Sequence, residues 1–219
     1  VFTLQVPRVL QLGIAGQIQY LLLEWIEPAS PGPTAWEEFG SALAQMHRGI
    51  HSYTGWTEDN YIGSLTQSNR QYDEWEIFFS ECRIRPLVKS LYDAGSFTRK
   101  EMVAAESFCK RAASLFPDEP MALLHGDLWS GNKMFTVGGR AAIFDPAVYF
   151  GHREMDIGMT KLFGGFDHRF FDAYQEAYPL EKDWQQRLPI VQLYPVLVHA
   201  VLFGGHYVQS AANTIQHFS

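Results

Sequence analysis

The sequence contains few cysteines and no pattern that would make them crosslinks or metal ligands. Cys82 and Cys109 are the only two in 219 residues, and they do not form a Cys-x-x-Cys pair. At this density a disulfide framework is excluded, and a protein of the reducing cytoplasm is expected. The first residues, Val1-Phe2-Thr3, lack a basic region and a start methionine, so a signal peptide is excluded and the chain is expected to be the interior of a longer one.

Basic residues are also scarce. The chain has 17 Lys and Arg against 24 Asp and Glu, which gives a formal net charge of −7. A protein that binds the phosphate backbone of nucleic acid needs clustered Lys and Arg, so a nucleic-acid partner is excluded. The acidic balance is compatible with a cationic or neutral polar substrate.

No hydrophobic run is long enough to cross a bilayer. The most apolar stretch, residues 194–208, includes His199, His206 and two glycines, and it is shorter than the roughly 20 residues that a spanning helix requires. This stretch is therefore predicted to be a buried core helix, and no membrane partner is expected. Hydrophobic residues make up 47% of the chain and aromatic residues 15%, so a packed core is expected.

Turn-forming residues divide the chain into two parts. Residues 6–12 and 18–25 are rich in β-formers and are separated by Gly13-Ile14-Ala15-Gly16, which predicts a β-hairpin. The Pro- and Gly-rich segment 28–33 then predicts a linker between lobes. A mostly helical lobe is expected beyond this linker.

The spacing of apolar residues predicts the elements of the larger lobe. A first helix, capped by Thr34, is predicted from apolar residues at helical intervals: Trp36, Phe39, Leu43, Met46 and Ile50. Residues 53–70 predict a long loop. The further predicted elements are helices at 72–93 and 98–115, strands at 133–137 and 140–145 joined by Gly138-Gly139, and a long final helix near 184–210.

One group of polar residues has the spacing of a phosphotransferase loop. Phosphoryl transfer requires a carboxylate to orient the attacking hydroxyl, and oxygen ligands to hold magnesium on the phosphates. Asp127 and Asn132 are five residues apart (132 − 127), and Asp145 follows Asp127 by 18 (145 − 127), after the predicted hairpin. This pattern predicts Asp127 as the catalytic carboxylate, and Asn132 and Asp145 as the metal ligands, of an ATP- and Mg²⁺-dependent kinase. The alternatives are a capping carboxylate at Asp127 and a structural turn at Asp145 before Pro146.

The motifs around this group resemble those of the fructosamine (ketosamine) kinases, relatives of the aminoglycoside and choline phosphotransferases. The resemblance runs over essentially the whole chain and rests on four segments: DNYIGS (59–64), LLHGDLWSGN (123–132), FDPAVYFGHREMDI (144–157) and LFGGF (162–166). It implies an α+β, protein-kinase-like fold. It also implies an enzyme that transfers the γ-phosphate of ATP to a sugar hydroxyl, the 3-hydroxyl, of a ketoamine that is either free or on a glycated lysine of a protein.

The resemblance also implies roles for residues outside this group. The backbone of Glu24 and Ile26, in the run LLLEWIE, would hydrogen-bond adenine at the hinge between lobes, and an ordinary strand end is the alternative. Trp129 would line the sugar site, with a core tryptophan as the alternative. His125 would brace the catalytic loop by hydrogen bonds, and a role as a base is the alternative. The run 152–156 would support the same loop, with a salt-bridged surface turn as the alternative.

Three parts of a complete kinase are missing before residue 26: a Gly-rich phosphate loop, a lysine that binds the phosphates and a glutamate that pairs with this lysine. Arg8 is the only basic residue in that part of the chain. Residues 1–26 are therefore expected to be the end of the small N-terminal lobe with the hinge, and residues 27–219 the helical C-terminal catalytic lobe. The missing parts are expected on a segment outside this chain.

Other functions compete with this one. An aminoglycoside or choline kinase would share the three catalytic residues, whereas a non-catalytic pseudokinase would keep the lobe without the reaction, and the intact group argues against the pseudokinase. A metal-dependent hydrolase would need more convergent His and Asp ligands. His47 and His51 have a zinc-binding spacing, but no glutamate follows His47 and no third ligand is evident, so no zinc site is predicted.

Overall fold

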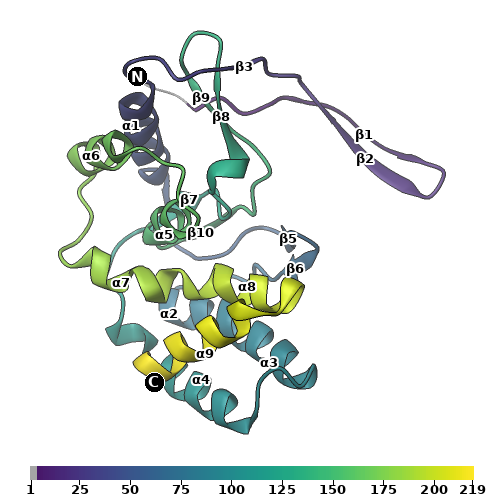
Figure 1. Cartoon of the computed structure of the whole chain (residues 1–219), viewed down its shortest axis with the longest axis vertical. Coiled ribbons are helices and arrows are strands. Elements are labelled where there is room, and N and C mark those ends of the chain that lie inside the picture. The colour runs from purple at the N-terminus through teal and green to yellow at the C-terminus, as the bar shows by residue number, and fades with distance from the viewer. Residues whose placement is uncertain (1–3) are drawn as a thin grey trace.

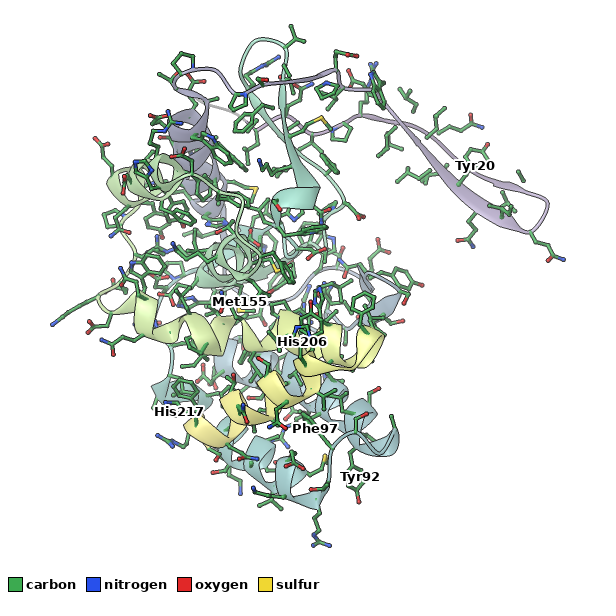
Figure 2. The ribbon with its side chains drawn as sticks, in the orientation of Figure 1. Tyr20, Tyr92, Phe97, Met155, His206 and His217 are labelled. Carbon is green, nitrogen blue, oxygen red and sulfur yellow. The ribbon has the colours of Figure 1, made fainter. Side chains whose placement is uncertain are left out.

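The computed structural model describes residues 4–219, so residues 1–3 of the predicted small-lobe segment lie outside the described residues. Figure 1 shows a largely helical body from which a two-stranded ribbon projects to one side. The ribbon consists of β1 (Val9–Ala15) and β2 (Ile18–Leu23). Nearly all of its side chains are exposed on both faces, and Figure 2 shows Tyr20 on this ribbon, away from the body.

The ribbon is the predicted hairpin, but its turn lies later in the sequence than expected. Gly13, Ile14 and Ala15 belong to β1 and pair with β2 residues as far as Tyr20. The predicted turn at 13–16 is therefore wrong in its first three residues. The chain reverses at Gly16, whose φ of 65° is a left-handed conformation that glycine adopts without steric cost.

Helices α1 (Ala35–His47) and α6 (His168–Ala177) pack side by side at one end of the body (Figure 1). Their backbones approach closely because Gly40 has no side chain, and a Cβ there would overlap the carbonyl oxygen of Phe170. The residues packed around this contact form a buried apolar cluster, which includes Trp36, Phe39, Leu43, Phe135 and Phe170.

The first helix begins where the sequence predicts and ends earlier. Thr34 precedes it, although the Thr34 hydroxyl donates a hydrogen bond of 2.8 Å to Glu38 and does not cap the backbone. Ile50 was expected on the apolar face of this helix, but it lies in β4 (Ile50–His51) and is 57% exposed. The chain leaves the helix at His47 so that β4 can pair with the strand that precedes the predicted phosphotransferase loop.

Two small sheets surround that loop. In the first, β7 (Met121–Leu124) pairs antiparallel with β4 on one side and with β10 (Tyr149–Gly151) on the other. In the second, β8 (Lys133–Thr136) and β9 (Ala141–Ile143) form the hairpin predicted across Gly138-Gly139, which is confirmed. Strand β3 (Pro28–Ala29) pairs with β8, so part of the predicted linker belongs to this sheet. The lobe boundary at residues 26–27 stays a prediction.

The helix predicted at 72–93 is confirmed as one helical run with an irregular middle. It consists of α2 (Trp75–Phe78), a π-helical segment (Phe79–Ile84) and α3 (Arg85–Asp93). A π-helix is rare and occurs mostly as a single wide turn inside an α-helix, often at a functional site. Here the wide turn contains the buried side chain of Arg83.

The segment predicted as a loop at 53–70 is irregular apart from a short hairpin. This hairpin consists of β5 (Asn60–Ile62) and β6 (Leu65–Gln67). The helix predicted at 98–115 is confirmed as α4 (Arg99–Arg111) followed by one 3-10 turn. A capping box of Thr98 and Glu101 starts α4, as sequences of this type favour.

The C-terminal part contains several helices, and the prediction of one long helix near 184–210 is wrong. After α5 (Glu154–Leu162) and α6, the chain folds in this range as α7 (Trp184–Val191), α8 (Leu193–Phe203) and α9 (His206–Phe218). The break after α8 falls at Gly204 and Gly205, whose positive φ values of 65° and 60° lie outside the α-helical region. Helix α9 then turns back and packs along α8 (Figure 1).

Helix α8 is a core helix of the protein. By length and composition, the 20 residues Trp184–Phe203 would also qualify as a membrane span. However, 50% of the most apolar 18-residue stretch within them is buried inside the protein. The buried residues of α8 join the larger of the two apolar clusters, which includes Phe78, Phe79, Phe108, Leu197 and Ile215. The prediction of a buried core helix is confirmed for α8.

A network of buried charges connects α5 with neighbouring segments. Arg153 Nε donates to Glu119 Oε2 over 2.9 Å, and Arg187 Nε on α7 donates to Glu154 Oε2 over 2.8 Å. The charged side chains of the run 152–156 are at most 2% exposed. The alternative that this run is a salt-bridged surface turn is therefore wrong.

His152 lies in the same network and is fully buried beside the rings of Trp75 and Phe116. Burial lowers the pKa of His152 to about 4, although the nearby Glu119 favours the protonated form. Burial would raise the pKa of Glu119, but the hydrogen bond from Arg153 and the surrounding positive charges hold it below its usual value. The folded state is thus built around a neutral His152 and a charged Glu119.

This arrangement predicts a loss of stability in mild acid. Between pH 6.5 and about 4 the unfolded chain protonates His152 and the folded protein does not, so the free energy of unfolding falls as pH falls, by up to about 1.4 kcal/mol per pH unit. Glu119 adds to the loss below its unfolded pKa.

Urea denaturation of the full-length protein at pH 7, 6 and 5 should show this slope. In His152→Gln the change of the unfolding free energy with pH should be smaller by up to about 1.4 kcal/mol per pH unit, the contribution of one proton. In the exposed control His206→Gln the slope should not change. An unaltered slope in His152→Gln would contradict the assignment.

Candidate active site

Asp127 and Asn132 lie on one tight loop between β7 and β8. A 3-10 turn at Ser130–Asn132 brings the Asn132 side chain back toward Asp127. Its Nδ2 donates to the backbone oxygen of Asp127 over 2.9 Å and to Asp127 Oδ2 over 3.1 Å. The same Nδ2 lies 3.4 Å from the backbone oxygen of Asp145. The three residues that were predicted from their spacing are therefore brought together in space.

Asp145 follows β9 in an unusual backbone conformation. Its φ is 56°, a left-handed value that is uncommon outside glycine and that Asp and Asn tolerate better than other residues. Burial and, next, the charge of Asp145 raise the pKa of Asp127 to about 6, against the hydrogen bond from Asn132. When two carboxylates lie side by side, a nearby cation stabilises their charged forms. The geometry and the charge therefore fit a cation at this loop.

The buried carboxylate of Asp156 fixes the start of the loop. Its oxygens accept hydrogen bonds from the backbone N–H of His125 over 2.8 Å and of Gly126 over 2.9 Å. His47 Nε2 lies 3.2 Å from Asp156 Oδ2, and His47 Nδ1 lies 2.8 Å from the hydroxyl of Tyr174. Burial would raise the pKa of Asp156, but these donors hold it below its usual value. A charged carboxylate in the interior thus holds the residues just before Asp127.

His125 braces the loop from inside. Its Nε2 lies 3.0 Å from the carbonyl oxygen of Phe144, which can only accept, so this nitrogen carries the proton. The other ring nitrogen, Nδ1, then accepts the backbone N–H of Asp127 over 3.3 Å. Burial lowers the pKa of His125, so the ring stays neutral. These bonds give His125 the bracing role that the resemblance implied.

A cavity of about 250 Å³ opens beside Asp127. Trp129, two residues further along the loop, lines it together with residues of α8, the end of α5 and the β5–β6 turn. Trp129 is 37% exposed, so the alternative that it is a core tryptophan is wrong. Its ring packs edge-on against Phe163, with centroids 6.1 Å apart. Its role as a substrate contact stays a prediction.

One wall of this cavity is held by a buried arginine that the sequence reasoning missed. Ile62 and Gly63 of the β5–β6 hairpin line the cavity. Arg83, in the π-helical segment, donates to the carbonyl oxygen of Ser68 over 2.5 Å and to Asn69 Oδ1 over 2.8 Å. Arg83 is fully buried, and among residues 4–219 no carboxylate pairs with it. Aromatic rings pack against its guanidinium instead, from Phe78, Tyr149 and Tyr194.

A second polar link joins the same wall to the segment between Asp145 and β10. Gln67 Nε2 donates to Asn60 Oδ1 over 2.8 Å and to the carbonyl oxygen of Ala147 over 3.0 Å. The hydroxyl of Tyr194, on α8, donates to Gln67 Oε1 over 2.6 Å. Asn60, in the DNYIGS segment, donates to the carbonyl oxygen of Val148 over 2.8 Å. The spacing of these residues does not reveal the contacts with Ala147, Val148 and Tyr194, because those partners lie 80 to 127 residues away.

A larger cavity of about 660 Å³ is lined by Asp145. Its walls are mostly apolar and come from the β1–β2 ribbon, the segment after β2 and the β8–β9 hairpin: Val9, Leu21, Leu23, Ile26, Met134 and Phe144. Glu24 also lines it, and the Glu24 N–H donates to the carbonyl oxygen of Arg8 over 2.9 Å. The Glu24 carbonyl and the Ile26 amide are the backbone groups through which these two residues could bind adenine. This hinge role stays a prediction.

The two histidines with zinc-binding spacing are directed to different surroundings. His47 is buried against Asp156 and Tyr174, whereas His51 is an exposed residue of β4 whose ring packs on Tyr53. Among the described residues, no three His, Cys, Asp or Glu side chains gather at one point. A metal at the Asp127 loop would therefore depend on the amide oxygen of Asn132 as well as on Asp145.

Comparison with known proteins places the chain in one family. The sequence profile of the family described as fructosamine kinase matches residues 2–219. The probable ketoamine kinase of Enterococcus faecium is 38% identical over 216 residues, which cover 98% of this chain and 77% of that protein. A crystal structure from Thermobifida fusca, assigned as a fructosamine-3-kinase, superposes with a TM-score of 0.85 at 37% identity, over 96% of this chain and 72% of that one.

More distant structures share the fold alone. An ADP-bound aminoglycoside phosphotransferase superposes with a TM-score of 0.55 at 13% identity, over 98% of this chain and 78% of that one. The α+β, protein-kinase-like fold that the motifs implied is confirmed. The chain belongs to the fructosamine kinase family of phosphotransferase enzymes.

Proposed function

We propose that this protein is an ATP- and Mg²⁺-dependent ketoamine kinase that phosphorylates the 3-hydroxyl of a fructosamine, either free or on a glycated lysine. Family membership implies ATP as the phosphate donor. The observation that carries the proposal is the position of Asp127 between two cavities. Asp127 lines the smaller cavity with Trp129, and through Asn132 it is tied to Asp145, which lines the larger one.

The larger cavity suits a nucleotide. Its apolar walls can enclose a flat base, and Glu24 and Ile26, in the irregular segment between β2 and β3, offer a carbonyl acceptor and an amide donor two residues apart. Both groups would pair with one edge of adenine. The phosphates would then extend toward Asp145, where this cavity meets the catalytic loop.

The donor set at that end fits magnesium. Mg²⁺ prefers hard oxygen ligands and is commonly held by one or two carboxylates together with substrate phosphates. Asp145 supplies a carboxylate, and Asn132 supplies its amide oxygen, because the amide nitrogen is already bound to Asp127. When bound, the ion would neutralise charge on the phosphates.

Asp127 would orient the acceptor hydroxyl and take up its proton. Its carboxylate is half-buried and lines the smaller cavity, which is the place for the acceptor. A pKa of about 6 lies close to the working pH, where a group exchanges protons effectively. The hydrogen bond from Asn132 limits the rotation of the Asp127 side chain, so one oxygen remains to meet the hydroxyl.

The proposal is tested by a phosphate-transfer screen. The full-length protein is supplied with ATP and Mg²⁺ and with a fructosamine, an aminoglycoside or choline, and transferred phosphate is measured. Turnover is expected with the fructosamine, and Asp127→Asn should lower kcat by about 10²-fold or more because the hydroxyl loses its proton acceptor. Turnover restricted to an aminoglycoside or to choline would contradict the substrate assignment. No turnover of any acceptor would favour a non-catalytic role.

A second prediction concerns the metal ligands. Asp145→Ala should abolish turnover because magnesium loses its carboxylate, while the melting temperature should fall only by the small amount that the positive φ of this exposed position costs an alanine. Asp183→Ala is the matched control, because Asp183 also has a positive φ, of 63°. It lies at the start of α7, away from the Asp127 loop. The control should keep full activity. Near wild-type turnover in Asp145→Ala would rule out this residue as a ligand.

A third prediction concerns the acceptor wall. Trp129→Ala should lower kcat/KM for a fructosamine by roughly 10–100-fold, since a lost packing contact beside the reacting group misplaces the sugar. The KM for ATP should be unchanged because the residues of the larger cavity are intact. Thermal unfolding of the same variant separates this effect from a general loss of structure. If turnover stays intact while the variant melts at a much lower temperature, Trp129 is a structural residue.

A further inference from the structure

The cavity beside Asp127 contains a continuous row of aromatic rings. Trp129 packs on Phe163 with ring centroids 6.1 Å apart, Phe163 lies 5.0 Å from His199, and His199 lies 5.5 Å from Phe203. The row begins on the catalytic loop and ends at the last residue of α8. It therefore leads away from Asp127 along one side of the cavity.

The chemistry of the cavity changes along this row. Among the described residues that line it, Asp127 and His199 are the only ionisable ones. The Nδ1 of His199 lies 2.8 Å from the carbonyl oxygen of Pro195, so this nitrogen donates its proton within α8. The remaining wall at that end is aliphatic, from Val198 and Leu202. The side-chain hydrogen-bonding groups of the lining are thus those of Asp127, Trp129 and the second ring nitrogen of His199, whereas the far end, at Leu202 and Phe203, offers apolar contact.

The rings of the row are left partly open to solvent. Phe203 is 69% exposed and Phe163 is 40% exposed, although both line a cavity. Exposed aromatic side chains at the rim of a cavity are characteristic of binding surfaces, because a ligand that covers them removes apolar area from water. The occupant of this end should therefore present an apolar group to the row.

We propose that the aromatic row binds the N-substituent of the ketoamine and selects acceptors in which this substituent is an apolar alkyl or aryl group. The inference rests on the proposed function, which puts a sugar hydroxyl at Asp127. In a ketoamine the nitrogen is attached to C1 of the sugar, so its substituent extends away from the ring and along the row. The protonated amine would lie over aromatic faces, where cation–π attraction favours a positive charge. Phe203, at the far end, contacts the outer part of the substituent.

The test compares two ketoamines with substituents of equal size. The full-length protein is assayed with the N-butyl and the N-(3-hydroxypropyl) derivatives of 1-amino-1-deoxyfructose. The first ends in a methyl group where the second has a hydroxyl. A hydroxyl buried against apolar rings loses its hydrogen bonds to water. The N-butyl compound is therefore expected to have a kcat/KM about 10-fold higher, with most of the difference in KM.

Variants locate the effect on the row. Phe203→Ser should reduce the preference for the N-butyl compound to about 2-fold or less. Tyr92→Ser is the matched control, because Tyr92 is an exposed aromatic residue on α3 (Figure 2), and the preference should remain about 10-fold. Equal kcat/KM values for the two compounds in the wild type, or an unchanged preference in Phe203→Ser, would overturn this inference alone. Absence of turnover with every ketoamine would overturn the proposed function and this inference with it.

Discussion

The buried carboxylate of Asp156 is the interaction on which the active site depends. It has no access to water, and its charge is stabilised by backbone N–H groups of His125 and Gly126 and by the ring of His47. Removing these donors would leave an unsolvated charge, which is costly in an apolar interior. The chain before Asp127 is therefore fixed in the one path that keeps all of these bonds. Gly126 completes the constraint, because a Cβ at this position, with φ of 82°, would overlap the carbonyl oxygen of Ala147.

Polar and apolar tasks are separated in this site. Hydrogen bonds position the residues that would meet phosphate and hydroxyl, whereas aromatic and aliphatic surfaces form the walls of both cavities. The wall formed by the β5–β6 hairpin combines the two, since Arg83 holds it with a positive charge that is balanced by carbonyl dipoles and aromatic faces. A guanidinium is weakly hydrated and can stack on rings, so it is better suited to such a position than an ammonium group.

The sequence predicts the chemistry of this molecule better than its supporting contacts. Asp127, Asn132 and Asp145 could be grouped because a loop and a hairpin of standard length separate them. The single C-terminal helix was wrong because apolar spacing continues across Gly204-Gly205, and periodicity does not register a change of chain direction. The buried position of Arg83 could not be predicted, since an arginine in a helix is usually a surface residue and its partners arise only from tertiary packing.

The π-helical segment has a consequence for how this protein can tolerate insertions and deletions. An α-helix advances by about 100° per residue, and a wide turn absorbs one extra residue without changing the direction of the flanking helices. Residues 79–84 form such a turn between α2 and α3. Loss of a single residue here would let α2 and α3 merge into one regular helix and would rotate Arg83 out of register with Ser68 and Asn69. The extra residue of the wide turn, as well as Arg83 itself, therefore keeps this wall of the smaller cavity in place.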